Sequence, residues 1–294
     1  MPDATVRGPV PATGAGQRSG PVLEVAGLRK EFGDLVAVDD VTFTVQAAGS
    51  LAIVGESGSG KTTIARMIVG LESPTGGTIT ACGNDRSRPA RAARDRRRRG
   101  REVQIVFQDP YTSLDPRQTA EQTLSEMIRL HHGWAADRRR ARVTELTELV
   151  GLDSRQARAL PRALSGGQRQ RVAIARALAA EPRVLILDES VAALDVSIQA
   201  QVLNLLAEIR DQTGVSYILI SHDLAVVRQL TEQVIVMHRG RVVERGATAR
   251  ILDDPQHPYT QRLRASVTRP GWKPARRPVL VGDGAAAPDG EAGP

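Results

Sequence analysis

Cysteine is nearly absent from the 294-residue sequence, which contains only Cys82. A single thiol can build neither a disulfide nor a cysteine metal centre within the chain, and this fits a reducing compartment. Aromatic residues are also scarce, at 3% of the chain. Such a composition suits an α/β protein with an Ala-, Leu-, Val- and Ile-rich core better than an all-β sandwich.

Long apolar segments are missing as well. No run approaches the roughly 20 residues needed to span a bilayer. Residues 1–20 are rich in Pro, Gly, Ala and Thr and lack the apolar stretch of a signal peptide. We therefore expect a protein that is made in the cytosol and stays there. Its length fits one large α/β domain or one domain with an inserted subdomain.

Lysine is rare too, since all but three of the 40 basic residues are arginine, and the net charge is +7. Such an excess is compatible with nucleic acid, with an anionic membrane face or with a GC-rich coding sequence. The arginines are spread through the chain, and few aromatic residues are interleaved with them as a base-stacking platform would require. We therefore expect no nucleic-acid partner.

Strand-like apolar runs alternate with helical stretches, which predicts an α/β fold with a mainly parallel sheet. Residues 23–45 and the hairpin-like stretch 234–243 are expected to be antiparallel. Residues from about 112 to 180 carry helical signals without a convincing strand, so we expect an inserted helical subdomain. The composition of residues 1–20 and 270–294 predicts disordered ends around one folded domain, 21–269. The predicted parallel strands are 51–54, 103–107, 184–187 and 217–220.

A phosphate-binding loop is the strongest motif in the sequence. It has the pattern G-x-x-x-x-G-K-[ST] and lies between an apolar run and a helical segment, a context that disfavours a mere Gly-rich turn. Its glycines allow backbone N–H groups to surround phosphates at a helix N-terminus. We expect Lys61 to reach the β- and γ-phosphates and the Thr62 hydroxyl to ligate Mg²⁺. The nucleotide-binding candidates here are Gly55, Glu56, Ser57, Gly58, Ser59, Gly60, Lys61, Thr62 and Thr63.

Two acids, Asp188 and Glu189, follow the apolar run 184–187. Open α/β sheets bind ligands at the carboxyl ends of their strands. We expect Asp188 to hold Mg²⁺, usually through water, and Glu189 to polarise the attacking water. A strand-end turn with solvated acids is the alternative, which the phosphate loop disfavours.

A third motif is Leu164-Ser165-Gly166-Gly167-Gln168-Arg169-Gln170-Arg171, followed by a helical run. The Ser165 side chain and the glycine amides at a helix start can receive a phosphate. Together with the two earlier motifs, this string resembles the signature of ABC ATPases. The resemblance implies a P-loop NTPase core with a mainly parallel sheet, an antiparallel β subdomain and an inserted helical subdomain. It also implies that Ser165, Gly166, Gly167 and Gln168 contact ATP held by an opposite subunit, so that the hydrolytic site is composite.

Four further residues match positions that the ABC resemblance assigns. Phe32 is expected to stack on adenine, although a core role is the alternative. Gln108 is expected to sense Mg²⁺ as a ligand and to touch the transmembrane partner. Asp195 is expected at the dimer interface near the nucleotide. His222 is expected to contact the γ-phosphate and, with Glu189 and Lys61, to complete the catalytic set.

A subfamily resemblance is also visible, to the ATPases of oligopeptide, dipeptide and nickel importers. It implies an ATP- and Mg²⁺-dependent hydrolase at the cytoplasmic face of the cell membrane, bound to permease subunits and to a second ATPase subunit of the same or another kind. An extracytoplasmic solute-binding protein would act indirectly. Peptides are the expected substrate, with nickel import, export or a soluble nucleic-acid ABC ATPase as alternatives. The subfamily resemblance rests on residues 107–110, 113–117, 194–201 and His257-Pro258-Tyr259-Thr260.

Two positions depart from the family pattern: Ser190 stands where proline is usual, and Ala192 where serine is common. Neither removes a catalytic group. The cysteine-containing C-terminal extension of many relatives is absent, so we expect no iron–sulfur cluster. The Arg-rich segment 86–101 is outside the family pattern; we interpret it as a solvated loop, with contact to anionic headgroups as the alternative.

Overall fold

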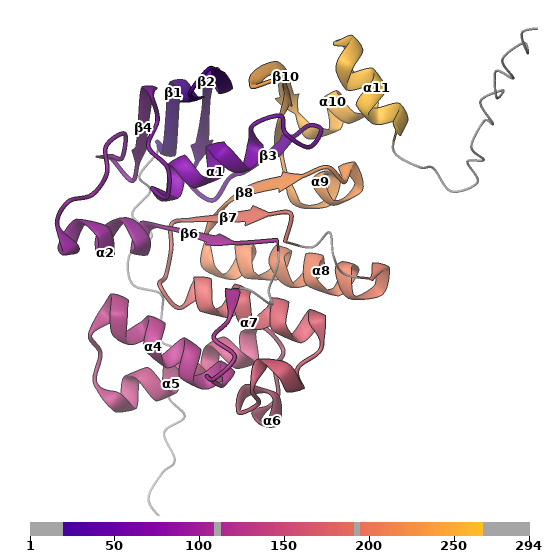
Figure 1. Cartoon of the computed structure of the whole chain (residues 1–294). Coiled ribbons are helices and arrows are strands. Elements are labelled where there is room, and N and C mark those ends of the chain that lie inside the picture. Colours follow the sequence, from indigo (N-terminus) through magenta and orange to yellow (C-terminus); the bar gives the residue numbers. More distant parts are fainter. Residues whose placement is uncertain (1–19, 109–112, 191–194, 267–294) are drawn as a thin grey trace, which may run out of the picture.

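The computed structural model describes residues 20–108, 113–190 and 195–266. Its central sheet consists of β3 (Ser50–Val54), β6 (Val103–Val106), β7 (Val184–Asp188), β8 (Ser216–Ser221), β9 (Gln233–His238) and β10 (Arg241–Ala247). The strand order is β10-β9-β3-β8-β7-β6 (Figure 1). Neighbours from β9 to β6 pair in parallel, and β10 pairs antiparallel with β9. The four predicted parallel strands are confirmed.

Strands β3, β7 and β8 are buried along their whole length, as expected where both faces of a parallel sheet are covered. Alternate residues of β7 enter different clusters. Leu185 and Leu187 pack with helices α7 (Gly166–Leu178) and α8 (Val196–Thr213), whereas Ile186 packs with α1 (Lys61–Val69). One sheet therefore supports two cores, because successive side chains point to opposite faces.

A second, antiparallel sheet lies beside the first (Figure 1). Its strands are β1 (Pro21–Phe32), β2 (Leu35–Gln46), β4 (Gly76–Ala81) and β5 (Asn84–Asp85). They run in the order β2-β1-β4-β5. Val25, Phe43 and Ile79 join the same core as α1. The antiparallel pairing predicted for residues 23–45, and for the β9–β10 hairpin, is confirmed.

The described residues between β6 and β7 form helices and no strand, as the sequence predicts. They pack against the core on the α7 and α8 side through residues such as Leu124 and Leu146. Capping boxes at Thr119 and Ser165 begin two of the helices. The boundaries proposed for a helical subdomain remain a prediction. The helices are α4 (Ala120–His132), α5 (Ala136–Leu149), α6 (Ser154–Ala157), the 3₁₀ turn Pro161–Ala163, and α7.

Three helices close the described chain: α9 (Leu224–Leu230), α10 (Thr248–Asp253) and α11 (Pro258–Ser266). Nowhere in the described part of the chain is a helix both long and apolar enough for a membrane span. The segments expected to be disordered, 1–20 and 270–294, lie outside the described residues except for Gly20. Residues 109–112 and 191–194 also lie outside the described residues, and they include 109–110 and 194 of the family segments and the departing position Ala192.

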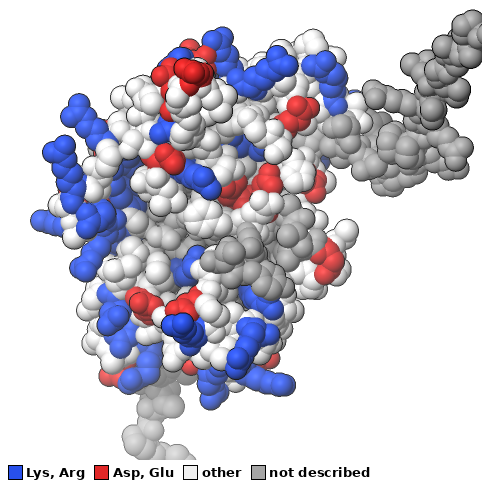
Figure 2. Space-filling view, in the orientation of Figure 1, with Lys and Arg blue, Asp and Glu red and all other residues white. Residues whose placement is uncertain are grey.

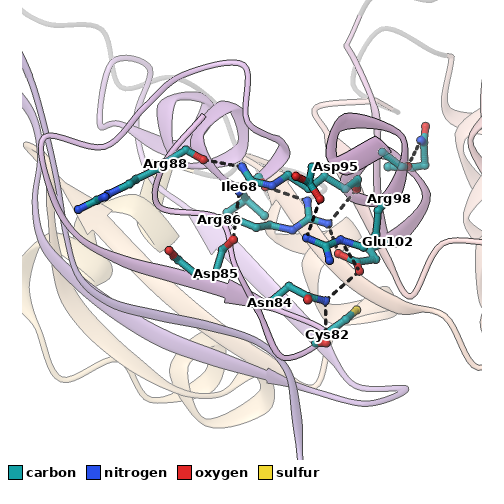
Figure 3. A network of polar contacts seen from close by, with 12 residues as sticks. Ile68, Cys82, Asn84, Asp85, Arg86, Arg88, Asp95, Arg98 and Glu102 are labelled. Atoms are coloured by element: carbon teal, nitrogen blue, oxygen red, sulfur yellow. Dashed lines mark hydrogen bonds and ion pairs between the residues drawn. The ribbon is translucent and has the colours of Figure 1, made fainter. Parts of the chain in front are cut away.

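The Arg-rich segment is not the solvated loop that we expected. Residues Ala93–Glu102 form helix α2, and Arg86 is buried in a polar network (Figure 3). The Arg86 guanidinium lies 2.7 Å from Glu102 and donates to the carbonyl oxygens of Arg99, at 2.8 Å, and Ile68, at 3.5 Å. This buried group joins the end of α1 to the end of α2, directly before β6. A run of like charges predicts solvent exposure, so the sequence did not indicate the buried contacts of Arg86.

The arginines of α2 itself fit the solvated interpretation, because no residue of this helix is buried. Figure 2 shows basic side chains gathered on the side of the molecule where α2 lies in Figure 1.

Candidate nucleotide-binding site

The phosphate loop joins β3 to α1 at the carboxyl end of the parallel sheet. Gly58 and Gly60 have φ of +80° and +101°, which favours glycine. A Cβ at Gly60 would also lie 2.5 Å from the Ala37 carbonyl oxygen, so no larger residue fits there. The glycines of the motif therefore permit a tight turn that ends on the N-terminus of α1.

Lys61 is buried at the first position of α1. Its Nζ donates to the carbonyl oxygens of Gly55 and Glu56, each at 2.8 Å. Burial lowers the pKa of this ammonium, and the nearby carboxylates Glu189 and Asp188 oppose that shift. An anion that enters the loop would favour the charged form of this buried ammonium.

Thr62 and Asp188, which are 126 residues apart, meet beside the loop. The Thr62 hydroxyl donates to Asp188 Oδ1 at 3.3 Å. Asp188 is 5% exposed, and burial raises the pKa of its carboxyl. Two hard oxygen donors thus face each other at the end of β7.

Glu189 and His222 form a second pair, from the ends of β7 and β8. Glu189 has φ of +47°, and its N–H donates to the Ile220 carbonyl oxygen at 2.9 Å. This conformation is unfavourable for a non-glycine residue by about 1–2 kcal/mol. His222 Nδ1 lies 3.4 Å from Glu189 Oε1. The Glu189 carboxylate thus lies beside the His222 ring, directly after the end of β7.

The phosphate loop and Glu189 line a cavity of about 370 Å³, whereas Asp188 and His222 are not among its lining residues. Phe32 is 46% exposed at its edge, with the Lys30 ammonium 4.7 Å from its ring centre. An exposed ring at a cavity edge does not fit the alternative of a core phenylalanine. Gln108 is exposed and also lines the cavity. The lining residues are Phe32, Leu35, Ala37, Ser57, Gly58, Gly60, Lys61, Thr62, Thr63, Gln108 and Glu189.

Several predicted residues lie elsewhere. Within the loop, Gly55, Glu56 and Ser59 do not line the cavity, and Ser59 is buried. Ser165, Gly166, Gly167 and Gln168 at the start of α7 are likewise outside the cavity lining.

The start of α7 is an exposed, capped helix end. The Ser165 Oγ accepts the Gln168 N–H at 3.3 Å, and Gln168 Oε1 accepts the Ser165 N–H at 2.8 Å. A Cβ at Gly167 would lie 2.5 Å from Ile198 Cγ2, so this glycine lets α7 approach α8. Asp195 is the N-cap of α8, where its Oδ1 accepts the Ile198 N–H at 2.9 Å.

Three contributors to the site could not be recognised in the sequence. Leu35 and Ala37 of β2 line the cavity, although nothing in a strand pattern marks them. The Tyr259 hydroxyl accepts a hydrogen bond from the Glu56 N–H. In the sequence, residues 257–260 indicated only the resemblance to the importer subfamily and no contact with the phosphate loop.

Comparisons with known proteins agree with this geometry. A family profile described as ABC transporter matches residues 38–192. A Brucella abortus protein named for ATP binding in peptide import is 47% identical over 259 residues, which cover 87% of this chain and 77% of that protein. The oligopeptide transport ATP-binding protein OppF of Lactococcus lactis is 43% identical over 234 residues, covering 80% of this chain and 73% of that protein.

Among solved structures, a dimeric post-hydrolysis state of the ATP-binding cassette MJ0796, bound to ADP and Pi, is similar with a TM-score of 0.69. It is 28% identical and covers 77% of this chain and 98% of that one. The fold and the loop together define a P-loop protein that binds and hydrolyses ATP. The chain belongs to the ABC transporter family.

Proposed function

We propose that this chain energises peptide import as the Mg²⁺-dependent ATPase subunit of a membrane transporter. The observation that carries the ATPase part is the convergence of Lys61, Thr62, Asp188, Glu189 and His222 beside one phosphate loop. The peptide part is supported by relatives that are named for peptide import and oligopeptide transport.

In the proposed reaction, phosphates lie on the amides of the loop at the N-terminus of α1, where the helix dipole favours negative charge. Lys61 leaves the Gly55 and Glu56 carbonyl oxygens and neutralises the β- and γ-phosphates. Glu189 accepts the proton of the attacking water, and His222 orients that carboxylate and contacts the γ-phosphate. Phe32 stacks on the adenine at the open edge of the cavity.

The residues present fit Mg²⁺. Thr62 Oγ1 and Asp188 Oδ1 are hard oxygen donors 3.3 Å apart, and Mg²⁺ in nucleotide sites is held by a few protein oxygens together with phosphates and water. Thr62 would bind the ion directly, Asp188 usually through water, and Gln108 would approach from the end of β6. The ion would neutralise charge that develops on the transferred phosphoryl group.

A second copy, or a related ATPase chain, would complete the site. Ser165, Gly166, Gly167 and Gln168 lie outside the cavity lining but present a helix N-terminus to solvent. Such an end is suited to an anion brought by another molecule. Asp195 would lie at the interface between the two chains. Closure over two nucleotides and reopening after hydrolysis would perform the transport work.

Permease subunits would hold this chain at the cytoplasmic face of the membrane and receive that work near Gln108. Gln108 is exposed at the end of β6 and lines the cavity, so it can contact both a ligand and a neighbouring protein. A partner docked there would bias the same open or closed equilibrium that ATP biases. A solute-binding protein would act through the permeases.

Reconstitution tests this function. With its permeases and binding protein in liposomes, the chain should hydrolyse ATP faster when a peptide is supplied. Gln108→Ala should reduce this stimulation more than it weakens ATP binding. Gln229→Ala is the matched control, because Gln229 is exposed on α9, where its side-chain amide donates to Asn204 Oδ1 at 3.1 Å. Stimulation by nickel, by export substrates or by DNA, with none by peptides, would contradict peptide import and leave the ATPase assignment standing.

A further inference from the structure

The C-terminal helix α11 reaches the nucleotide site through one side chain, Tyr259. Its hydroxyl oxygen accepts a hydrogen bond of 3.0 Å from the backbone N–H of Glu56, which is 203 residues earlier in the chain. Glu56 follows Gly55 at the entry of the phosphate loop. Tyr259 is only 3% exposed, so water competes little for this bond.

Contacts on several sides hold the tyrosine in place. Its ring centre lies 4.0 Å from that of His238 at the end of β9. Its own N–H donates to His257 Nδ1 at 3.2 Å. The Glu244 carboxylate of β10 accepts the N–H groups of Gln256, at 2.8 Å, and His257, at 3.2 Å. The β9–β10 hairpin thus fixes the turn before α11, and the hydroxyl is preorganised for the loop.

The carbonyl oxygens and the amide at the entry of the phosphate loop are held by different groups. Lys61 donates to the carbonyl oxygens of Gly55 and Glu56, and the Ser59 N–H also donates to the Glu56 carbonyl oxygen, at 3.2 Å. A bound phosphate would attract the Lys61 ammonium away from both oxygens. A Cβ at Gly55 would lie 2.3 Å from the Met237 carbonyl oxygen, so the loop entry packs closely on β9. Once Lys61 turns to the nucleotide, the Tyr259 hydroxyl still holds the Glu56 amide.

We propose that Tyr259 is a positioning residue of the ATP site, which fixes the entry of the phosphate loop before ATP binds. A preordered loop loses less entropy when the ligand arrives, and this raises affinity. The inference rests on nucleotide binding by the loop and not on peptide import, so a different transported substrate would leave it intact. It also makes α11 part of the site, and reciprocity requires that ATP stabilise the docking of α11.

Tyr259→Phe tests the hydroxyl alone, and Tyr217→Phe is its matched control. Tyr217 is also buried, and its hydroxyl donates to the Leu206 carbonyl oxygen at 2.7 Å, between β8 and α8. Tyr217 pairs with Ser50, at the end of β3 that is away from the loop. Each variant loses one buried hydrogen bond, so both should unfold at a slightly lower temperature.

Three measurements on the full-length protein separate the variants. ATP affinity should fall about threefold to tenfold in Tyr259→Phe, the range that one net hydrogen bond supplies, and stay near wild type in Tyr217→Phe. KM for ATP should rise while kcat changes little. Without nucleotide, amide exchange at Glu56 should be faster only in Tyr259→Phe, and ATP should slow exchange in α11 of the wild type.

Wild-type ATP affinity and Glu56 exchange in Tyr259→Phe would overturn the proposal, as would equal losses of affinity in both variants. Exchange at Glu56 is measured without nucleotide, so it reports on the loop even if turnover is lost. Failure of peptide to stimulate the reconstituted transporter would bear only on the import function.

Discussion

The phosphate-loop region and the start of α7 both offer a helix N-terminus to an anion, yet they are built differently. In the loop region Lys61 and Asp188 are buried, and burial shifts the pKa of each toward the neutral form. Glu189 nearby has an unfavourable positive φ. At the start of α7, Ser165 is exposed and its capping box is complete. Without ligand, the loop region therefore includes buried charges and a strained backbone that lower stability. The start of α7 has neither feature.

This difference indicates that the two regions bind phosphate in different ways. Buried charges and backbone strain persist where the surrounding fold imposes them and where a bound ligand offsets their free energy. The loop region therefore fits a nucleotide that this chain holds itself. An exposed, satisfied helix end needs no ligand to be stable, so it fits a phosphate that arrives with another subunit.

Glu189→Gln should give the largest effect on turnover. The amide keeps the shape of the side chain but cannot accept a proton. The rate of hydrolysis should therefore fall by about 10²- to 10⁴-fold, whereas the affinity for ATP should not change. Phosphate release and equilibrium binding measure the two quantities. Glu232→Gln, at an exposed carboxylate 3.3 Å from Arg210, is the control and should leave turnover unchanged. Normal turnover in Glu189→Gln would remove Glu189 from the proposed mechanism.

Ser165→Arg places a bulky cation at the exposed helix end. We expect ATP affinity of the isolated monomer to remain, whereas hydrolysis at protein concentrations that allow dimers should fall by about 100-fold, because the second anion site is blocked. Ser154→Arg adds the same bulk at the exposed start of α6 and should have little effect. Collapse of ATP affinity in monomeric Ser165→Arg would show that the two regions serve one local site.

Lys61→Ala should weaken binding and hydrolysis together. Charge-assisted hydrogen bonds contribute about 1.5–3 kcal/mol, so affinity for ATP should fall by about 10- to 150-fold. Isothermal titration and steady-state kinetics measure the change. A variant with unchanged affinity but reduced turnover would mean that Lys61 contacts the phosphates only in the transition state.

Much of this organisation could be predicted from the sequence. The buried strands are short apolar runs, and each motif lies directly after a strand or before a helix, so local pattern was enough to bring the phosphate loop and Asp188 to one sheet edge. The resemblance to ABC ATPases added the expectation for Phe32, whose exposed ring at the cavity edge fits it.

The contacts that could not be predicted are long-range and polar. No spacing rule relates Tyr259 to Glu56 or indicates that Arg86 turns inward to Glu102 while its neighbours stay in solvent. Both depend on how separate elements pack, because a buried donor or acceptor must find a partner wherever the fold supplies one. The composition of the Arg-rich segment predicted a solvated loop, but Arg86 within it is buried and joins the end of α1 to the end of α2.

The smallest effects concern stability without nucleotide. Burial raises the pKa of Asp188, so its carboxyl binds a proton more tightly in the folded protein than in the unfolded chain. The stability linked to this group is present below the pKa of unfolded aspartate and is lost as the pH rises through the folded pKa. At pH 7, above the pKa of unfolded aspartate, burial of this carboxyl therefore lowers the stability of the nucleotide-free protein.

Asp188→Asn should then raise the unfolding free energy at pH 7 by about 0.5–2 kcal/mol, and Ser165→Ala should lower it by about 1 kcal/mol through loss of a helix cap. Thermal unfolding at pH 7 measures both, as shifts of a few degrees in opposite directions.

At acidic pH, as Asp188 takes up its proton, the stability advantage of Asp188→Asn over the wild type should shrink. With Mg²⁺ and ATP the wild type should regain the advantage, because ligand binding adds stability in proportion to affinity. A lower melting temperature for Asp188→Asn than for Ser165→Ala at pH 7 would contradict the contrast between the two regions, since the buried carboxylate would then stabilise the protein before any nucleotide binds.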